Sequence, residues 1–305
     1  RRIRRLWPVL VLLFCGPLQA AEIFVDAPLD DDVTVRGDGV CTLREALGNV
    51  IDNNPLFSPD CAPGATGSDT IILPAGTLTL NSQLDVVGSN VVIEGAATAD
   101  ASGAPVQEST IIEGSGTHRL IQASSGLTLR NLTLQGGRAT GDGGAIFTEK
   151  ALALEQVALL DNQATGDGGA IYLNANPNDV TDVTFAKSYA ADNVAAGEGG
   201  LLSTFGQNQV YRIYVENSTF FRNQGGTGPG AFDLSLASGS MIVVNSTFSA
   251  NRGASGTGSA LDVLDSSARF LVLKDRKSVV LGFTLFLGGL CIIFEKFSSV
   301  SFLSI

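Results

Sequence analysis

Three acidic residues occupy equivalent places in three glycine-rich segments of the chain. Asp142 and Asp167 lie in two copies of the octapeptide ATGDGGAI, at 139–146 and 164–171, and Glu198 lies in the related GEGG. Carboxylate and carbonyl oxygens are the ligands that Ca²⁺ accepts in flexible geometry. One interpretation is a calcium site formed by Asp142, Asp167 and Glu198. The other is that each acid shapes its own glycine turn and stays solvated.

A second set of carboxylates raises the question of catalysis. Cleavage of a glycosidic bond by paired carboxyl groups needs both groups on opposite sides of one sugar-binding cleft. Asp161 and Asp192 hold equivalent places in successive repeats, so we expect them to be neighbours, although solvation of a turn accounts for them equally well. His118 is the only histidine, which excludes a metal site with several histidine ligands, and we interpret it as structural.

The charge of the chain excludes some partners. The 305 residues contain 30 Asp and Glu against 19 Lys and Arg, a formal net charge of −11, and the body, residues 21–273, contains 28 of these acidic residues and 11 of the basic ones. An acidic body repels nucleic acid and anionic membranes, so we expect no nucleic-acid partner. The glycine turns lack the helix and lysine of a phosphate-binding loop, and we expect no small-molecule cofactor.

Both ends differ from the glycine-rich body. Residues 1–20 combine four arginines, the apolar stretch Leu6–Phe14 and an acceptable cleavage site at Leu18–Ala20. This combination predicts a secretory signal peptide. Residues 274–305 are apolar and break the repeat pattern. We interpret this tail as a non-native ending; the alternative is a short membrane segment within Ser278–Phe294.

A repeat defines the body. Five blocks begin 25 to 31 residues apart, at 127–134, 152–159, 183–190, 213–220 and 241–248. Their first and third positions are mostly large and apolar, as in a strand with one buried face. The fifth position is a polar corner that turns the chain onto a second short strand, and it is occupied by Asn131, Gln156, Lys187, Asn217 and Asn245.

An asparagine follows each of the last four blocks, and tight glycine turns come after it. No helical stretch separates the strands, which excludes alternating strands and helices. Stacked coils of short parallel strands place identical residues about 4.8 Å apart. The sequence therefore predicts an all-β fold, a right-handed parallel β-helix over residues 81–273, with a structural asparagine ladder of Asn162, Asn193, Asn223 and Asn251.

Residues 21–80 predict a cap for one end of this β-helix. In CTLREALGNVID, Thr42 and Glu45 have the spacing of a capping box, and an apolar face follows, so we expect a helix at about 43–52. An open end of a solenoid needs such a cover. Cys41 and Cys61 are the only cysteines of the body, and the export signal favours a disulfide between them.

These segments resemble known families. DGVCTLREAL, followed by DCAPGATGSDTIILPAGTLTL, is similar to the CSLREA-type N-terminal domain of exported bacterial β-helix proteins over about Asp38–Leu80, with Thr42 where that family usually has Ser. The body resembles polymorphic outer-membrane protein repeats, known by GGAI and FxxN: GGAI stands at 143–146 and 168–171, and FxxN at 220–223 and 248–251. The resemblance implies secretion, a β-helix and roles in attachment or adhesion, and it names no catalytic residue.

Together these observations predict a protein secreted or displayed at the cell surface or outer membrane of a bacterium, with an adhesin-like binding surface for an extracellular protein or glycan. The alternative is a polysaccharide lyase or glycosidase of the β-helix type, since fold alone does not decide function. Tyr211, Tyr214 and Phe221 are candidates for an exposed aromatic patch, although scattered surface aromatics are the simpler account.

Overall fold

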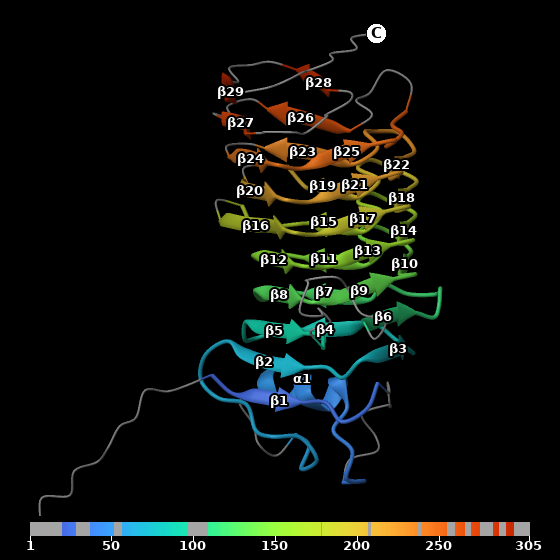
Figure 1. The fold of residues 1–305 in the computed structure, drawn as a ribbon, viewed down its shortest axis with the longest axis vertical. Coiled ribbons are helices and arrows are strands. Elements are labelled where there is room, and N and C mark those ends of the chain that lie inside the picture. Colours follow the sequence, from blue (N-terminus) through green and yellow to red (C-terminus); the bar gives the residue numbers. More distant parts are fainter. Residues whose placement is uncertain are drawn as a thin grey trace, which may run out of the picture.

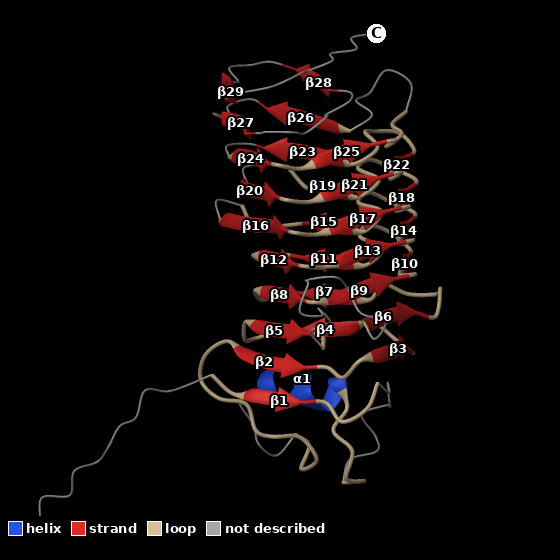
Figure 2. Ribbon diagram, viewed as in Figure 1, coloured by secondary structure: helices blue, strands red, loops and turns tan. Residues whose placement is uncertain are grey.

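The computed structural model describes residues 20–28, 37–51, 57–96, 109–177, 179–206, 209–236, 239–254, 260–265, 270–274, 283–286 and 291–295. The chain forms parallel strands that coil into stacked rungs along the long axis of the molecule (Figure 1). One short helix lies at the N-terminal end of this stack, and the other described elements are strands (Figure 2). The predicted all-β, parallel β-helix is confirmed.

Four sheets run along the stack, and successive rungs contribute neighbouring strands to each of them. Sheet A consists of β1 (Glu22–Phe24), β2 (Asp69–Ile72), β5 (Val91–Glu94), β8 (Leu127–Arg130), β12 (Leu152–Glu155), β16 (Val180–Ala186), β20 (Val210–Glu216), β24 (Ser240–Val244), β27 (Phe270–Lys274) and β29 (Cys291–Glu295). Sheet B consists of β25 (Thr247–Ser249), β21 (Thr219–Phe221), β17 (Tyr189–Ala191), β13 (Ala158–Leu160), β9 (Leu132–Gln135), β6 (Thr110–Gly114) and β3 (Gly76–Leu80).

The other two sheets complete each rung. Sheet C consists of β28 (Phe283–Phe286), β26 (Leu261–Asp265), β23 (Phe232–Leu236), β19 (Leu202–Thr204), β15 (Ile171–Leu173), β11 (Ile146–Thr148), β7 (Ile121–Ala123) and β4 (Leu84–Val86). The short sheet D consists of β10 (Arg138–Ala139), β14 (Gln163–Ala164), β18 (Val194–Ala195) and β22 (Gln224–Gly225). From β8 to β24 the chain visits sheets A, B, D and C in turn before it returns to sheet A.

Two left-handed corners per rung turn the chain from sheet to sheet. The predicted polar corner joins sheets A and B, and all five of its residues have positive φ, from 46° to 54°, at Asn131, Gln156, Lys187, Asn217 and Asn245. A second corner follows sheet B, with φ from 52° to 60° at Asp161, Asp192, Arg222 and Ala250. Non-glycine residues rarely adopt this conformation because it crowds Cβ, so the stacked neighbours must hold it in place.

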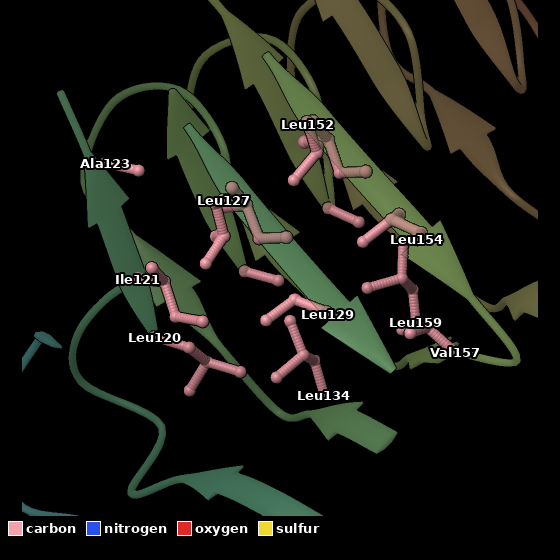
Figure 3. Packing of buried hydrophobic residues seen from close by; sticks show 14 of the residues in the cluster. Leu120, Ile121, Ala123, Leu127, Leu129, Leu134, Leu152, Leu154, Val157 and Leu159 are labelled. Carbon is pink, nitrogen blue, oxygen red and sulfur yellow. The ribbon is translucent and has the colours of Figure 1, made fainter. Parts of the chain in front are cut away.

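The core lies inside the coil, where alternate residues of sheets A, B and C point inward. Leucines such as Leu127, Leu129, Leu152 and Leu154 dominate the middle rungs (Figure 3). Towards the C-terminus, Phe185, Phe220, Phe232 and Phe248 take over, with ring centroids 4.7 to 5.7 Å apart. Each ring rests on rings of neighbouring strands, so the core is continuous from rung to rung.

The N-terminal cap is as expected from its sequence. Helix α1 (Leu43–Ile51) begins after Thr42, whose N–H donates to the Glu45 carboxylate at 3.0 Å, and the Glu45 N–H lies 3.4 Å from the Thr42 hydroxyl. This is the predicted capping box. The apolar face of α1 packs against the core at the end of the stack. Cys41 and Cys61 form the predicted disulfide, with their Cα atoms 4.8 Å apart.

Some expectations fall at or beyond the limits of the described residues. Of the predicted signal peptide, the described residues include only Ala20. Asp52, the expected last residue of the helix, also lies outside the described residues. Within the tail, β28 and β29 continue sheets C and A by pairing with β26 and β27. Among the described residues, no helix is long and apolar enough to cross a membrane.

Candidate functional site

The four predicted asparagines stand in one buried ladder beside the second corner. The side-chain amide of Asn162 donates to Oδ1 of Asn193 at 3.0 Å, and that oxygen also accepts the backbone N–H of Asn162 at 3.1 Å. The same pair of bonds joins Asn193 to Asn223 and Asn223 to Asn251. Each of the four amides also donates to a carbonyl of the preceding rung. The ladder is structural.

A second ladder, which was not predicted from the sequence, lies beside the first corner. The hydroxyl of Ser188 accepts the N–H of Val157, that of Ser218 accepts the N–H of Ser188, and that of Ser246 accepts the N–H of Ser218. Each hydroxyl also donates to the carbonyl two residues earlier. The signal was visible as a serine directly after the polar corner in three successive repeats. These residues hold the fold and face the interior.

The acids of the glycine turns form a third ladder. Oδ1 of Asp142 accepts the N–H of Asp167 at 2.8 Å, and Oδ1 of Asp167 accepts the N–H of Glu198 at 2.8 Å. A Cβ at Gly166 or Gly197 would lie about 2 Å from the carboxylate of the rung before. Asp142 and Asp167 thus each bond to the turn of the next rung, which explains the repeated octapeptide without a metal. In the part of the chain that the structure describes, no three His, Cys, Asp or Glu residues form a group able to hold a metal ion.

The carboxylates considered for catalysis are placed as corner residues. Asp161 and Asp192 occupy the second corner in successive rungs, as expected. Asp192 is held in a two-pronged ion pair by Arg222 of the next rung, at 2.8 and 2.6 Å. His118 lies in a turn, where its Nδ1 is 3.3 Å from the Ser115 hydroxyl and 3.2 Å from that of Thr117. None of these contacts positions a pair of carboxyl groups across a cleft.

The expectation of an aromatic patch that includes Tyr211 is wrong. Its side chain is fully buried, and its hydroxyl lies 3.1 Å from the carbonyl of Leu173 and 3.0 Å from that of Phe205. Burial raises the pKa of this phenol to about 12. Tyr211 is the first inward-facing residue of β20, so it closes the core at the end of the strand. Tyr214, by contrast, is exposed on the outside of sheet A.

Sheet A has a step between β12 and β16, where a long strand lies beside a shorter one. Strand β12 has four residues and β16 has seven. Pairing between them begins only at Leu152 and Val183, whereas β16 already pairs with β20 from Val180 and Val210. The first residues of β16 therefore project beyond the shorter rungs, and on the β12 side they have no ladder partner. The sequence signal was the lengthened spacing of the repeats at this point.

Two adjoining hollows lie at the foot of this step, with volumes of about 190 and 400 Å³. They share Asn90, Gly126 and Ala151 and together form one shallow groove, which we call the step groove. Its lining is rich in hydroxyl, amide and small side chains, namely Ser68, Asn90, Ser124, Ser125, Thr128, Ala151, Ala153, Thr181 and Thr184. A concave surface that offers both hydrogen-bonding and apolar groups suits a ligand that carries both.

A straight row of outward-facing residues forms the floor of the step groove. Val92, Thr128, Ala153 and Thr184 are register partners in β5, β8, β12 and β16, and all of them line the groove. The next partner in the row is Tyr214 of β20, whose side chain is 37% exposed. Successive members are about 4.8 Å apart, which is the strand spacing. The row runs along the axis of the β-helix, and beyond the tyrosine it continues with Ile242 of β24.

Ion pairs line the wall of the step groove. Lys150 Nζ donates to Asp179 at 2.7 Å, and Arg212 binds Asp182 through two bonds of 2.6 Å. The bond from Lys150, together with one from Asn176 and the lysine charge, holds the pKa of Asp179 below its usual value. The same contact with Asp182 raises the pKa of Arg212 further. These exposed pairs add little stability. Their effect is that each carboxylate in the wall is balanced by a cation.

Scans of protein-family models, curated proteins and solved structures return no match to this chain. What the step groove can bind is therefore inferred from its own geometry and chemistry.

Proposed function

We propose that this is an extracytoplasmic, adhesin-like binding protein that is secreted or displayed on a bacterial surface and contacts its ligand through the step groove. The Cys41–Cys61 disulfide supports an oxidising compartment. The predicted signal peptide and the resemblance of Asp38–Leu80 to the N-terminal domain of exported β-helix proteins support export.

The single observation that carries the proposal is the step in sheet A. At the step, the floor row, the unpaired side of β16 and the two ion pairs surround one concave surface of mixed polar and apolar character. Rigid strands position all of these groups, which is the arrangement that a binding site needs.

The alternative function, cleavage of a polysaccharide, fits the same groove less well. A glycosidase needs one carboxyl group that stays protonated as a general acid, which requires a raised pKa. Asp179 has a lowered pKa, and Asp182 is bound through both oxygens to Arg212. Both groups are therefore suited to charge balance more than to proton transfer.

Two matched alanine variants test the proposal. Ala153 faces outward on the floor of the step groove, and Ala158 faces outward on sheet B, a few residues along the same rung. The full chain and the variants Ala153→Arg and Ala158→Arg are passed over immobilised neutral polysaccharides, uronic-acid polysaccharides and collagen, and binding is measured by surface plasmon resonance. We expect at least one probe to bind the wild type and Ala158→Arg, and to bind Ala153→Arg at least about tenfold more weakly.

Equal loss in both variants, or no binding of any probe by the wild type, contradicts the proposal. The same polysaccharides are assayed for new reducing or unsaturated ends. Their release by the wild type but not by Ala153→Arg would favour the enzyme instead.

A further inference from the structure

The chemistry around the step groove also indicates which ligand it takes. We infer that the step groove binds a neutral glycan whose chain lies along the axis of the β-helix and packs against the ring of Tyr214. This inference rests on the proposed function, because it names the ligand class of the same site.

Charge is the first argument. Three cations border the floor row, and each is paired: Lys150 with Asp179, Arg212 with Asp182, and Arg130, which lies 3.9 Å from Glu94 and 3.4 Å from Glu155. An acidic glycan needs cations that are available to its carboxylates, and here its carboxylates would compete with Asp and Glu already in place. A neutral ligand breaks none of these pairs.

The lining is the second argument. The hydroxyls of Thr128 and Thr184 and the amide of Asn90 are suited to exchange hydrogen bonds with a polyhydroxy chain. Between them, Ala151 and Ala153 keep the floor low, so that a bulky ring can approach the sheet. A peptide is less well matched. The unpaired stretch of β16 covers only Val180–Asp182, shorter than the five or six residues, roughly, of an ordinary strand.

The tyrosine in the floor row is the third argument. The Tyr214 hydroxyl donates to the Glu216 carboxylate at 2.8 Å, two residues along the same outward face. This bond draws the ring along the strand and fixes its orientation, while 37% of the side chain stays exposed. A fixed, exposed aromatic ring offers a flat apolar surface at little entropic cost, which suits the C–H face of a sugar ring.

The direction of the ligand follows from the register. The floor row crosses five rungs at one side chain per rung, so equivalent contacts recur about every 4.8 Å along the axis. A polymer with a repeating unit can use such a row over its length. A single small molecule would use only part of it.

Matched tyrosines test the inference by isothermal titration calorimetry on the full chain. Tyr214 on sheet A and Tyr189 on sheet B are exposed to similar degrees, 37% and 41%. The probes are gluco-, manno- and xylo-configured neutral hexasaccharides and a galacturonic acid hexasaccharide. We expect at least one neutral probe to bind at least about tenfold more tightly than the acidic probe. Tyr214→Ala should lose about tenfold of that affinity, and Tyr189→Ala less than about twofold.

Charge selectivity is tested with Asp182→Asn, which leaves Arg212 without its carboxylate partner. We expect this variant to bind the acidic probe at least about threefold more tightly than the wild type does, since an available guanidinium attracts a carboxylate. Preference of the wild type for the acidic probe, or equal loss in both tyrosine variants, overturns the inference. If no hexasaccharide binds while Ala153→Arg still abolishes binding to collagen, the ligand class is wrong and the proposed function stands. If no probe binds at all, both fail.

Discussion

The N-terminal cap and the repeating rungs solve the same problem, the burial of polar groups, in opposite ways. In the cap, buried Asn49 donates to the carbonyls of Ser58, Cys61 and Ala62 and accepts the N–H of Ser58, all within 13 residues of sequence. In the rungs, Asn193 bonds to residues 30 to 34 positions away, one rung before and one rung after it.

This difference shows where each region takes its stability from. The cap is a local network closed by one covalent bond, whereas a rung depends on both of its neighbours and in turn supports them. A destabilising variant in the cap should therefore affect only the cap, whereas one in a rung should also destabilise the neighbouring rungs, as in other solenoids. Variants in both regions test this contrast, and the most destabilising variant comes first.

The largest loss of stability is expected for Asn193→Ala in the middle of the ladder. The variant leaves the amide and the backbone N–H of Asn162 without the acceptor that Asn193 supplies, and it removes one donor to the carbonyl of Leu159. Each buried group left unpaired costs about 1–3 kcal/mol, so the total should exceed about 3 kcal/mol. Urea denaturation and amide hydrogen exchange measure it, and lost protection should extend into the adjacent rungs.

Asn217→Ala is the matched control, since Asn217 is an exposed corner residue with φ of 49°. Its cost should be only about 1 kcal/mol, the strain of a left-handed alanine. Similar costs for the two asparagines would contradict the structural ladder.

Removal of the disulfide by Cys41→Ala with Cys61→Ala comes next. The bond closes a loop with a sequence separation of 20, for which loop-closure entropy contributes about 3 kcal/mol. We expect α1 to lose hydrogen-exchange protection while the rungs from 127 to 254 keep theirs. Non-reduced peptide mass spectrometry first verifies the bond in the wild type. If protection falls equally throughout the molecule, the cap is not an independent local unit.

Tyr211→Phe tests how two rungs are joined at the end of the core. Deletion of the hydroxyl leaves the N–H of Ala175 without its acceptor and should cost about 1–2 kcal/mol at neutral pH. Burial raises the pKa of Tyr211 from 10.0 to about 12, so above pH 10 the unfolded chain releases a proton that the folded chain keeps. The stabilisation from this phenol is complete below pH 10 and is lost as the pH rises towards 12.

Thermal melts between pH 8 and 12 should therefore show a steeper decline for the wild type than for Tyr211→Phe. Parallel declines would mean that Tyr211 titrates as an exposed tyrosine. Because the wild type and the variant retain the same other tyrosines, the titration of those tyrosines contributes equally to both melts.

The mildest variants are those of the glycine turns. Asp167→Ala removes the acceptor of the Glu198 N–H and should cost about 1 kcal/mol, while Asp167→Asn keeps an acceptor and should cost less than about 0.5 kcal/mol. Millimolar calcium should shift the melting temperature of the wild type and of Asp142→Asn/Asp167→Asn equally. A shift confined to the wild type would instead establish the calcium site that these acids first suggested.

Much of the fold could be predicted because stacked rungs need similar residue types at equivalent positions, so the sequence repeats. Asn131, Gln156, Lys187, Asn217 and Asn245 recur since every rung must turn at the same place. The step groove could not be predicted in this way. Its floor includes Thr128, Ala153 and Thr184, ordinary outward residues that line a groove only where β16 extends beyond β12. Likewise, the sequence did not show that Tyr211 is buried and Tyr214 exposed. Residues three positions apart face opposite sides only if both lie in the same strand, and the structure shows that β20 contains both.

The parallel β-helix, the asparagine ladder, the capping helix and the disulfide could all be predicted from the amino-acid sequence. The helix and the disulfide were predicted from residues close in sequence, and the β-helix and the asparagine ladder from strict repetition. Both kinds of pattern can be seen in the sequence itself. The bonds of the turn acids and the position of the step groove, the proposed binding surface, emerged only from the folded chain. Asp142 bonds to the next rung because a glycine there leaves room for its carboxylate, and the groove exists because two paired strands differ in length. Both facts depend on which rung lies beside which, and register is a property of the stacked molecule.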